Sequence, residues 1–283
     1  MITLTSAEMN TWIAALLWPL TRILGLIAAA PIFGNTSVPV SVKVALGVIL
    51  ATIMGPLVPA LPAADPMSMA GYLILAQELL VGLAMGFTMR VVFAAVEMAG
   101  EVSSLTMGLG FATFFDPQSQ GRSSAISQFL ALIATMAFLA TNAHLVLLEA
   151  LAESFITLPV SAQPLSLGAP LAMARWGGEV FSAGMQISLP IVAALLVTNV
   201  ALGILTRAAP QLNIFGIGFP ISLGVGLLVI SLVLPYLSGP FEHLFNRGVE
   251  TSRSIPRAAA QRAPAAGNDV QKTLSVQGLS NKN

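Results

Sequence analysis

Three long stretches without a charged residue constrain the fold of this chain more than any other feature. Ala208–Phe241 has 34 residues without a charge, Val180–Thr206 has 27 and Ser123–Leu148 has 26. About 20 residues in an α-helix cross the hydrocarbon of a bilayer, so each stretch is long enough to span it. Charged residues make up only 8% of the chain, whereas about 25% is usual in soluble domains. The sequence therefore excludes an ordinary soluble enzyme and predicts an all-α, membrane-associated protein.

Glycine, proline and polar turns divide the apolar stretches into six candidate helices. We expect them at Asn10–Ala30, Ser41–Leu57, Met69–Leu105, Ser123–Leu151, Arg175–Thr206 and Phe215–Leu237. The last two are joined only by the short segment Arg207–Asn213, so they should form an antiparallel hairpin.

The C-terminal segment differs from the rest of the chain in composition. Residues 247–283 contain six Lys or Arg and two acids, and from Thr251 onward Ser, Arg, Ala, Pro, Gln and Asn dominate. A segment of this kind has too little apolar surface to offset the entropy of ordering it. We therefore predict a disordered basic tail over residues 247–283, on the cytoplasmic side because basic residues beside a final span favour that side.

The other loop charges do not fit a chain that crosses the membrane six times in simple succession. With the C-terminus inside, Arg90, Arg122 and Arg207 would all lie outside, against the usual cytoplasmic excess of basic residues. Either the charge bias is weak or some of the helices do not cross the bilayer. A cleaved signal peptide is not expected, because Met1–Thr11 has no basic residue and Arg22 interrupts the apolar run.

Little in the sequence supports catalysis or cofactor binding. The chain has no Cys, and His144 and His243 have no neighbouring second ligand for a metal. No glycine-rich phosphate-binding loop with the GxxxxGK[ST] spacing is present. A net charge of zero gives no reason to expect nucleic acid as a partner. We therefore expect a non-enzymatic protein without a metal or another cofactor.

Acidic residues lie unusually deep in the third candidate helix. Glu97 and Glu101 are four residues apart on one helical face, and Arg90 lies seven residues before Glu97 on roughly the same stripe. Charges inside an apolar helix are costly unless they pair or face water. Two interpretations remain open: these residues form polar contacts between subunits, or this end of the helix simply emerges into solvent.

The segment after Glu101 combines chain-breaking residues with bulky apolar side chains. Its candidate functional residues are Met107, Gly108, Gly110, Phe111, Phe114, Phe115, Asp116 and Pro117. Glycine and Asp-Pro interrupt regular structure, and a loop of Met and Phe side chains would suit a hydrophobic seal across a channel. The alternative is a re-entrant turn whose aromatic residues lie at headgroup depth. The residues alone favour this second interpretation.

Two further groups of residues suggest close helix packing and contacts with partners. Gly82 and Gly86 are spaced four apart, which permits close approach of two helix backbones. The segment Arg207–Pro220 supplies the candidate contact residues Arg207, Pro210, Gln211, Asn213, Gly216, Gly218 and Pro220. A transporter could use helices broken by Pro and Gly to bind an ion or substrate. The two spans around this segment have no ionisable residue, which argues against ion coupling.

Five segments of the chain carry a family resemblance through their order and spacing. They read WPLTRILGLIAAAPIFG, SVPVSVKVALG, GFTMRVVFAAVEMAGEVSSLTMGLGFATFFDPQSQ, NAHLVLLEAL and LTRAAPQLNIFGIGFPISLGVGL. Together they resemble the flagellar members of the FliR/SctT family of type III secretion export-gate proteins. The resemblance runs from about Trp12 to Phe245, and Glu97–Pro117 and Arg207–Gly226 are its most specific parts.

The resemblance implies a non-enzymatic subunit of the flagellar export gate in the bacterial inner membrane and flagellar basal body. Its partners would be FliP, FliQ and FlhB, and unfolded flagellar proteins would pass through the gate. The implied architecture is a FliP-like half, residues 1–174, and a FliQ-like helical hairpin, residues 175–246. Much of the helical assembly would be raised above the bilayer, which would account for the irregular loop charges. Nothing from the family applies to the tail after Gly248.

The family also implies roles for individual segments. The loop over residues 108–122 would plug the central export channel, which reverses the preference that the residues alone gave. Arg90, Glu97 and Glu101 would then be polar contacts near the plug. Arg207–Pro220 would form a tight bend against FliQ and FlhB. A stand-alone carrier of small molecules or ions, and a structural scaffold without a gating role, remain the alternatives.

Overall fold

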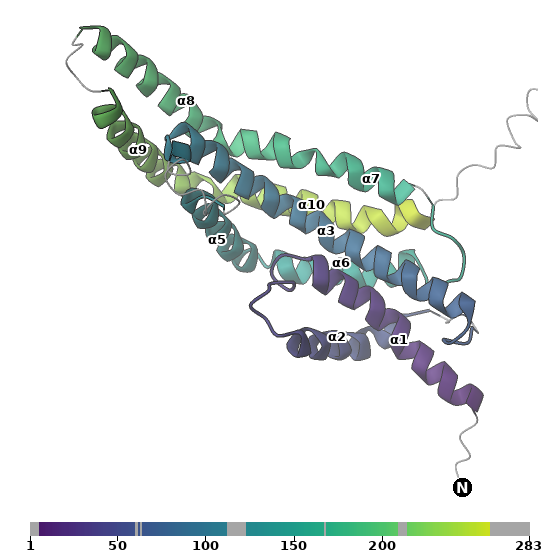
Figure 1. Ribbon diagram of the computed structural model, residues 1–283. Coiled ribbons are helices and arrows are strands. Elements are labelled where there is room, and N and C mark those ends of the chain that lie inside the picture. Colours follow the sequence, from purple (N-terminus) through teal and green to yellow (C-terminus); the bar gives the residue numbers. More distant parts are fainter. Residues whose placement is uncertain are drawn as a thin grey trace, which may run out of the picture.

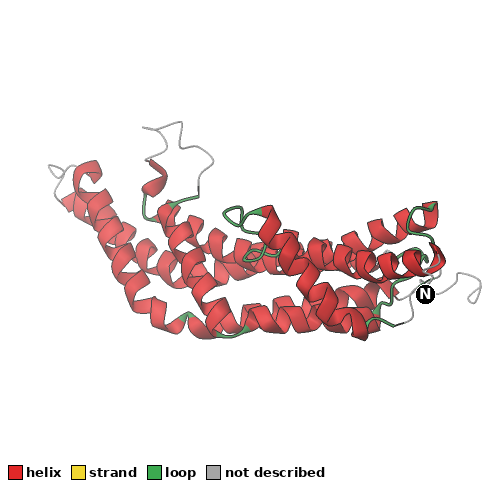
Figure 2. Ribbon diagram, turned by 90° about the horizontal axis from the view of Figure 1, so that it is seen from below, coloured by secondary structure: helices red, strands yellow, loops and turns green. Residues whose placement is uncertain are grey.

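The computed structural model describes residues 6–59, 62, 64–111, 123–166, 168–208 and 214–260. In these ranges every regular element is a helix (Figure 2), which confirms the predicted all-α class. The α-helices are α1 Ser6–Ala29, α2 Val40–Met54, α3 Met69–Thr106, α5 Ala125–Ala140, α6 Ala143–Thr157, α7 Gly168–Gly177, α8 Glu179–Ala208, α9 Ile214–Val233 and α10 Ser238–Ala260. Short 3-10 turns lie at η1 Gly55–Leu57, η2 Leu109–Phe111 and η4 Leu234–Tyr236.

Helix α3 is the central element, and α1, α5, α8 and α10 all pack along it (Figure 1). It has 38 residues, which at 1.5 Å per residue gives a rod of about 57 Å, well beyond the roughly 30 Å of bilayer hydrocarbon. Ser68 caps its start, where the Ser68 hydroxyl accepts a hydrogen bond from the Gly71 N–H at 3.1 Å. Its buried residues include Ile74, Met85 and Val96, so its apolar surface faces neighbouring helices over most of its length.

Glycine residues bring α1 and α3 into backbone contact. A Cβ atom on Gly82 would overlap the carbonyl oxygen of Arg22, and one on Gly86 would lie 2.6 Å from that of Leu26. On the facing helix, a Cβ on Gly25 would lie 2.8 Å from the carbonyl oxygen of Leu79. Only residues without a side chain permit this approach, which places the Gly82 and Gly86 pair at the α1–α3 contact.

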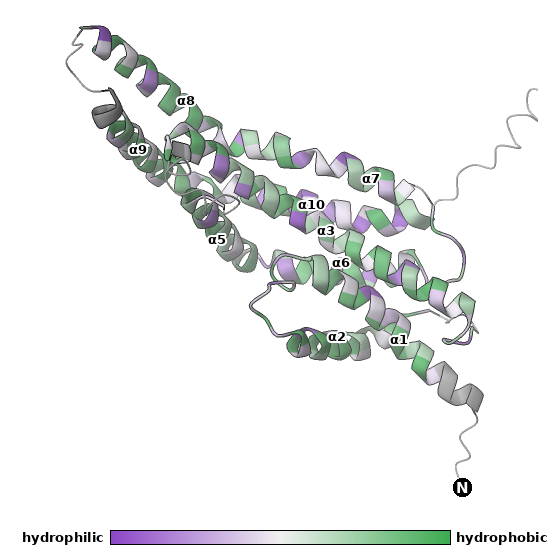
Figure 3. Ribbon diagram, viewed as in Figure 1, coloured by the Kyte–Doolittle hydropathy of each residue, from purple (hydrophilic) through white to green (hydrophobic). Residues whose placement is uncertain are grey.

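Five helices in the described ranges are long and apolar enough to cross a membrane, or six if the bent pair α5 and α6 is one span. Several are poorly covered within the chain: only 17% of the apolar window in Val40–Leu57, and 22% of the one in Gly168–Ala208, is buried. Figure 3 shows hydrophobic residues over α2, α5, α8 and α9, whereas α10 is more polar. Apolar faces this extensive need lipid or other subunits to cover them.

Two of the six expected helices are broken in the structure. The helix expected at Ser123–Leu151 divides into α5 and α6, which meet at a bend of 65°. Asn142 lies at the bend with a left-handed φ of 56°, a conformation that Asn tolerates better than most residues. The helix expected at Arg175–Thr206 begins earlier, at Gly168, and is interrupted between α7 and α8 at Gly178. The expectation of uninterrupted helices was therefore wrong at both places.

The predicted disordered tail was wrong over residues 247–260, because this segment is the second half of α10. One face of α10 is buried, through Phe241, Leu244, Phe245, Gly248, Val249, Ser252, Ile255, Pro256 and Ala259. The spacing of three or four residues is that of an amphipathic helix, so the polar composition belongs to its exposed face. Residues 261–283 of the predicted tail lie outside the described residues.

Helices α8 and α9 run antiparallel and side by side (Figure 1), as expected for a hairpin. A hydrogen bond links them, in which the Ser222 hydroxyl donates to the Asn199 side-chain oxygen at 3.3 Å. Before the hairpin separates from the body, α8 packs on α3 at Gly184, where a Cβ atom would lie 3.0 Å from the Ala95 carbonyl oxygen. Helices from before and after the predicted boundary between residues 174 and 175 therefore pack against α3.

Candidate functional site

The end of α3 and the start of α5 are tied together by hydrogen bonds on either side of residues 112–122. The backbone N–H of Ser124 donates to the Glu101 carboxylate at 2.6 Å. Ser124 is the N-cap of α5, where unpaired N–H groups and the helix dipole favour a negative charge. Glu101 thus caps α5 from a neighbouring helix, while the Ser124 hydroxyl caps it locally by accepting from the Ser127 N–H at 3.1 Å.

Close backbone packing strengthens this connection. The Ser127 hydroxyl donates to the backbone carbonyl of Glu97 at 2.9 Å, and a Cβ on Gly100 would overlap the Cα atom of Ser127. We call Gly100, Glu101, Ser124 and Ser127 the loop base, because they join α3 near its end to the start of α5, the helices on either side of residues 112–122.

The predicted plug residues in the described part of the chain follow directly after α3. Gly108 has φ of 87°, the left-handed conformation that ends a helix, and its N–H donates to the Leu105 carbonyl at 3.0 Å. Met107 is fully buried, and a Cβ on Gly226 of α9 would lie 2.4 to 2.9 Å from the Met107 side chain. Gly110 and Phe111 belong to η2. The remaining plug candidates, Phe114, Phe115, Asp116 and Pro117, lie outside the described residues.

Arg90 and Glu97, but not Glu101, line a cleft of about 460 Å³. The cleft lies between α3, α5 and the turn after α1, and Asn35, Gln128 and Thr135 add polar groups to its lining. Arg90 and Glu97 are both exposed, and neither forms an ion pair with another described residue. The cleft therefore offers both charges to a neighbouring molecule, whereas Glu101 serves a contact within the chain.

The strongest polar cluster of the described residues was missed by sequence reasoning. Arg22 of α1 is completely buried and pairs with Glu78 of α3, with Nε–Oε2 and NH2–Oε1 distances of 2.6 and 2.9 Å. The same guanidinium donates to Ser154 at its carbonyl oxygen (2.9 Å) and hydroxyl (3.1 Å), and to the Leu158 carbonyl (2.9 Å). Its carbon lies 4.5 Å from the centroid of the Phe155 ring. All five N–H groups of Arg22 thus find an acceptor, and the cluster joins α1, α3 and the end of α6.

A second cluster joins the α7–α8 break to α10 and α3. Glu179 and Arg247 form a two-point ion pair at 2.7 and 3.0 Å, and the Arg247 guanidinium carbon lies 5.6 Å from the centroid of the Trp176 ring. The Trp176 indole N–H donates to the Thr88 carbonyl of α3 at 3.0 Å.

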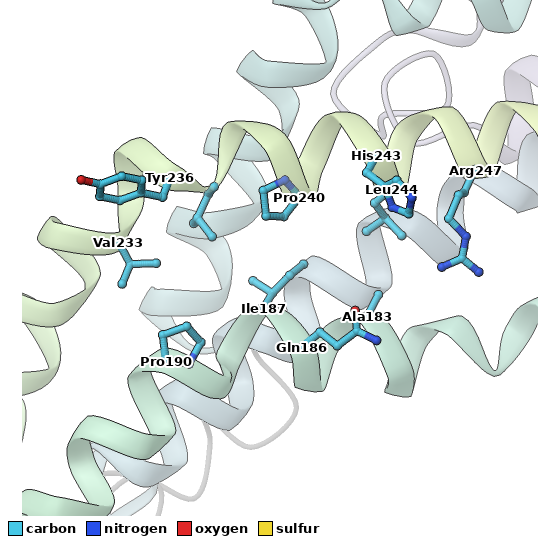
Figure 4. Close-up of a pocket in the computed structure, with 11 residues that line it drawn as sticks. Ala183, Gln186, Ile187, Pro190, Val233, Tyr236, Pro240, His243, Leu244 and Arg247 are labelled. Atoms are coloured by element: carbon cyan, nitrogen blue, oxygen red, sulfur yellow. The ribbon is translucent and has the colours of Figure 1, made fainter.

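A cavity of about 390 Å³ lies next to Arg247, between α8 and the start of α10 (Figure 4). Pro190 of α8 and Pro240 of α10 line its two sides, with Gln186 and His243 among the polar groups. Pro190 inside α8 removes a backbone hydrogen bond at the level of η4, which separates α9 from α10. This is where the α8–α9 hairpin leaves the helical body (Figure 1).

The candidate contact segment Arg207–Pro220 lies at the far end of that hairpin. Arg207 is exposed in the last turn of α8, and Gly216, Gly218 and Pro220 belong to α9. Pro210, Gln211 and Asn213 lie outside the described residues. In the described ranges, no three His, Cys, Asp or Glu residues gather where they could hold a metal ion.

The loop base gives a direct test of how Glu101 acts. In Glu101→Ala the Ser124 N–H loses a charged acceptor, a bond of about 1.5–3 kcal/mol, so we expect its amide hydrogen exchange to become roughly 10- to 100-fold faster. Glu101→Gln, which keeps an acceptor oxygen, should show a smaller change. Glu97→Ala is the control, because only the Glu97 backbone contributes to the loop base. Equal exchange in all three variants, measured by mass spectrometry on peptides covering Ser123–Gln128, would contradict this role.

Comparison with known proteins identifies relatives over most of the chain. Residues 13–248 match the model of the family described as bacterial export proteins, family 1. The chain is 43% identical over 246 residues to the flagellar biosynthetic protein FliR of Pectobacterium carotovorum subsp. carotovorum, covering 87% of this chain and 94% of that protein. It is 40% identical over 248 residues to the FliR protein of Escherichia coli (strain K12), covering 87% of this chain and 94% of that protein. The FliR protein of Bacillus subtilis (strain 168) is 30% identical over 238 residues, covering 83% of this chain and 91% of that protein.

Proposed function

Because the chain belongs to the bacterial export proteins, family 1, we propose that it is a non-enzymatic subunit of the flagellar type III export gate. The names of its relatives support a role in the flagellar export apparatus. Its apolar helices, several long enough to cross a bilayer, support a place in the bacterial inner membrane. Within the gate, we place it in the flagellar basal body, where it helps to form the channel for unfolded flagellar proteins.

Its proposed role within the gate is to plug the channel with the loop over residues 108–122. The observation that supports this most is the loop base, which joins the helices before and after the loop through the Glu101–Ser124 hydrogen bond and the Gly100–Ser127 contact. A plug must be anchored firmly at its ends and must present apolar side chains that exclude water. Phe111, Phe114 and Phe115 supply such side chains in the sequence. The plug prevents leakage of small ions at rest and moves aside when an unfolded substrate arrives.

Deleting Gly108–Gly121 tests this assignment. Closing the gap with a short Gly/Ser linker leaves the loop base in place while removing the apolar seal. We expect a severalfold higher ion leak through the assembled gate, measured as loss of membrane potential in cells or as ion flux in liposomes.

Substitutions within the loop provide the controls for that deletion. Replacing Phe111, Phe114 and Phe115 by leucine keeps the apolar character and should preserve the seal, whereas replacing them by serine should raise the leak. An unchanged leak in the deletion variant, with normal assembly, would remove the plug assignment and leave a structural scaffold.

The proposed partners are FliP, FliQ and FlhB. The exposed apolar faces of α2, α8 and α9 need a cover that the chain does not provide, and the cleft with Arg90 and Glu97 offers charges for a neighbouring subunit. The FliP-like part, residues 1–174, would face FliP, and the hairpin of residues 175–246 would face FliQ. Its tip, Arg207–Pro220, would reach FlhB.

Affinity purification of the tagged chain, followed by native mass measurement, tests this set of partners. FliP should be recovered together with the chain from its own membrane. Recovery of the chain alone, with uptake of a small solute by the purified protein in liposomes, would instead support a stand-alone carrier.

A further inference from the structure

The cleft that Arg90 and Glu97 line shows the same residue pattern on both of its helices. On each helix the lining residues have the spacing i, i+3, i+4, i+7, which is one stripe over two helical turns. In each stripe the two outer residues are polar and the two inner residues are apolar, so the cleft has polar ends and an apolar middle. The stripes are Arg90, Phe93, Ala94 and Glu97 on α3, and Gln128, Ala131, Leu132 and Thr135 on α5.

The two helices run antiparallel along the cleft, which decides which polar residues lie at the same end. The Ser127 hydroxyl donates to the Glu97 carbonyl at 2.9 Å, and the ring centroids of Phe93 and Phe138 are 5.7 Å apart. Residue numbers therefore rise along α5 as they fall along α3. The two ends of the cleft have opposite charges: Glu97 with Gln128 at one, and Arg90 with Thr135 at the other.

The surface of α5 around the cleft is apolar and faces outward. Phe129, Leu132 and Met136 are 41%, 56% and 53% exposed. A surface of this kind is normally covered by lipid or by protein. Arg90 and Glu97 form no ion pair with any residue of the described ranges, and a charge that faces hydrocarbon without a partner is costly. Whatever covers this face must therefore bring an opposite charge to each end of the cleft.

We propose that the cleft binds one helix of a partner subunit, which brings an acidic side chain to Arg90 and a basic side chain to Glu97. This inference rests on the proposed function, which gives the chain partner subunits in a gate. Arg90 and Glu97 are seven residues apart, or about 10 Å along α3. Side chains seven residues apart on a partner helix have the same separation and lie on one face, so they match both charges at once.

The middle of the cleft also fits a helix better than a lipid. Ala94 and Ala131 have small side chains, which permit another helix to approach closely, and apolar residues of that helix pack over them. An anionic lipid head group would be repelled by Glu97. The two charges of a zwitterionic head group are too close together to reach both ends of the cleft.

Photo-crosslinking at Leu132 identifies what covers the cleft. Leu132 is replaced by benzoylphenylalanine in cells that make the whole gate, the cells are irradiated, and the adducts are mapped by mass spectrometry. We expect an adduct to a helix of another subunit in which an acid and a base lie roughly seven residues apart on either side of the crosslinked position. An adduct with lipid alone, within the chain itself, or with a segment that lacks these charges would overturn the proposal.

Charge reversal tests whether the two ends of the cleft select that helix. Arg90→Glu and Glu97→Arg should each lower the yield of the Leu132 adduct by about fivefold or more, because like charges that face each other across an interface repel. Glu250→Arg is the matched control and should leave the yield unchanged, since Glu250 is exposed on α10 and does not line the cleft. Exchanging the acid and the base of the mapped helix should restore the yield in the double variant Arg90→Glu with Glu97→Arg. Unchanged yields in both single variants, or no recovery in the exchanged pair, would refute the inference.

These results are distinguishable from a failure of the proposed function. If FliP is recovered with the tagged chain but Leu132 crosslinks only to lipid, the inference is wrong and the gate assignment stands. If FliP is not recovered but a helix with the expected charges is crosslinked, the inference stands and the gate assignment is wrong.

Discussion

Replacing Glu78 by alanine is expected to lower the free energy of unfolding by about 3–5 kcal/mol, because it leaves a buried guanidinium without its counter-charge. Arg22 is fully buried and cannot turn to solvent. Its other acceptors, Ser154 and Leu158, are neutral and cannot compensate the charge. Since this one cluster joins α1, α3 and α6, its loss also weakens the contacts among these three helices.

Thermal unfolding in mild detergent measures this effect. The Glu78→Ala variant should unfold roughly 6–20 °C below the parent protein, given about 2–4 °C per kcal/mol for a chain of this size. The double variant Arg22→Met with Glu78→Leu should recover much of the loss, because apolar residues of similar volume replace buried pairs well. Glu179→Ala, which breaks the partly exposed pair with Arg247, is the control and should cost at most about 1 kcal/mol. A small effect of Glu78→Ala would mean that water reaches the Arg22 site.

Gly82→Ala is expected to destabilise the protein by about 1–3 kcal/mol, although alanine favours helices. The added Cβ would overlap the Arg22 carbonyl oxygen, which belongs to the rigid backbone of α1, so the two helices must separate. That separation would also strain the nearby Arg22–Glu78 pair.

A matched substitution at Gly203 distinguishes the effect of helix packing on stability from the effect of helix propensity. Gly203 lies in α8, and a Cβ there would meet no atom within 4 Å. Gly203→Ala should therefore be neutral or stabilise by up to about 1 kcal/mol. Glycine to alanine is thus expected to lower the free energy of unfolding at Gly82 but not at Gly203. Thermal unfolding measures both effects. Equal effects at Gly82 and Gly203 would show that α1 and α3 are less closely packed than the structure indicates.

Helix positions could be predicted well from the sequence. Long charge-free stretches avoid water, and a helix provides internal hydrogen bonds for their backbone N–H and C=O groups. The breaks were harder to predict. The apolar pattern around Asn142 does not distinguish a continuous helix from the 65° bend. Helix α10 was missed because its composition was considered without its spacing. Phe241, Phe245 and Ile255 lie at helical intervals and reveal a buried face.

The loop base and the Arg22 cluster show what single residues can reveal. Glu101 could be identified as unusual because charges are rare in apolar helices, but its partner, Ser124, could not be. Arg22 is the one charged residue in the helix expected at Asn10–Ala30, and its partner is 56 residues away. Both pairings depend on how the helices cross, which a single sequence does not specify.

The place of α10 in the fold sets an order for the assembly of this chain. Its Gly248 and Ser252 contact α3, where the Ser252 hydroxyl donates to the Met85 carbonyl at 3.3 Å. Because synthesis proceeds from the N-terminus, one flank of α3 stays uncovered until almost the whole protein has been made. Helix α10 therefore closes this side of the core after the other described helices have been made, and chains that terminate before residue 238 would leave an apolar surface of α3 exposed.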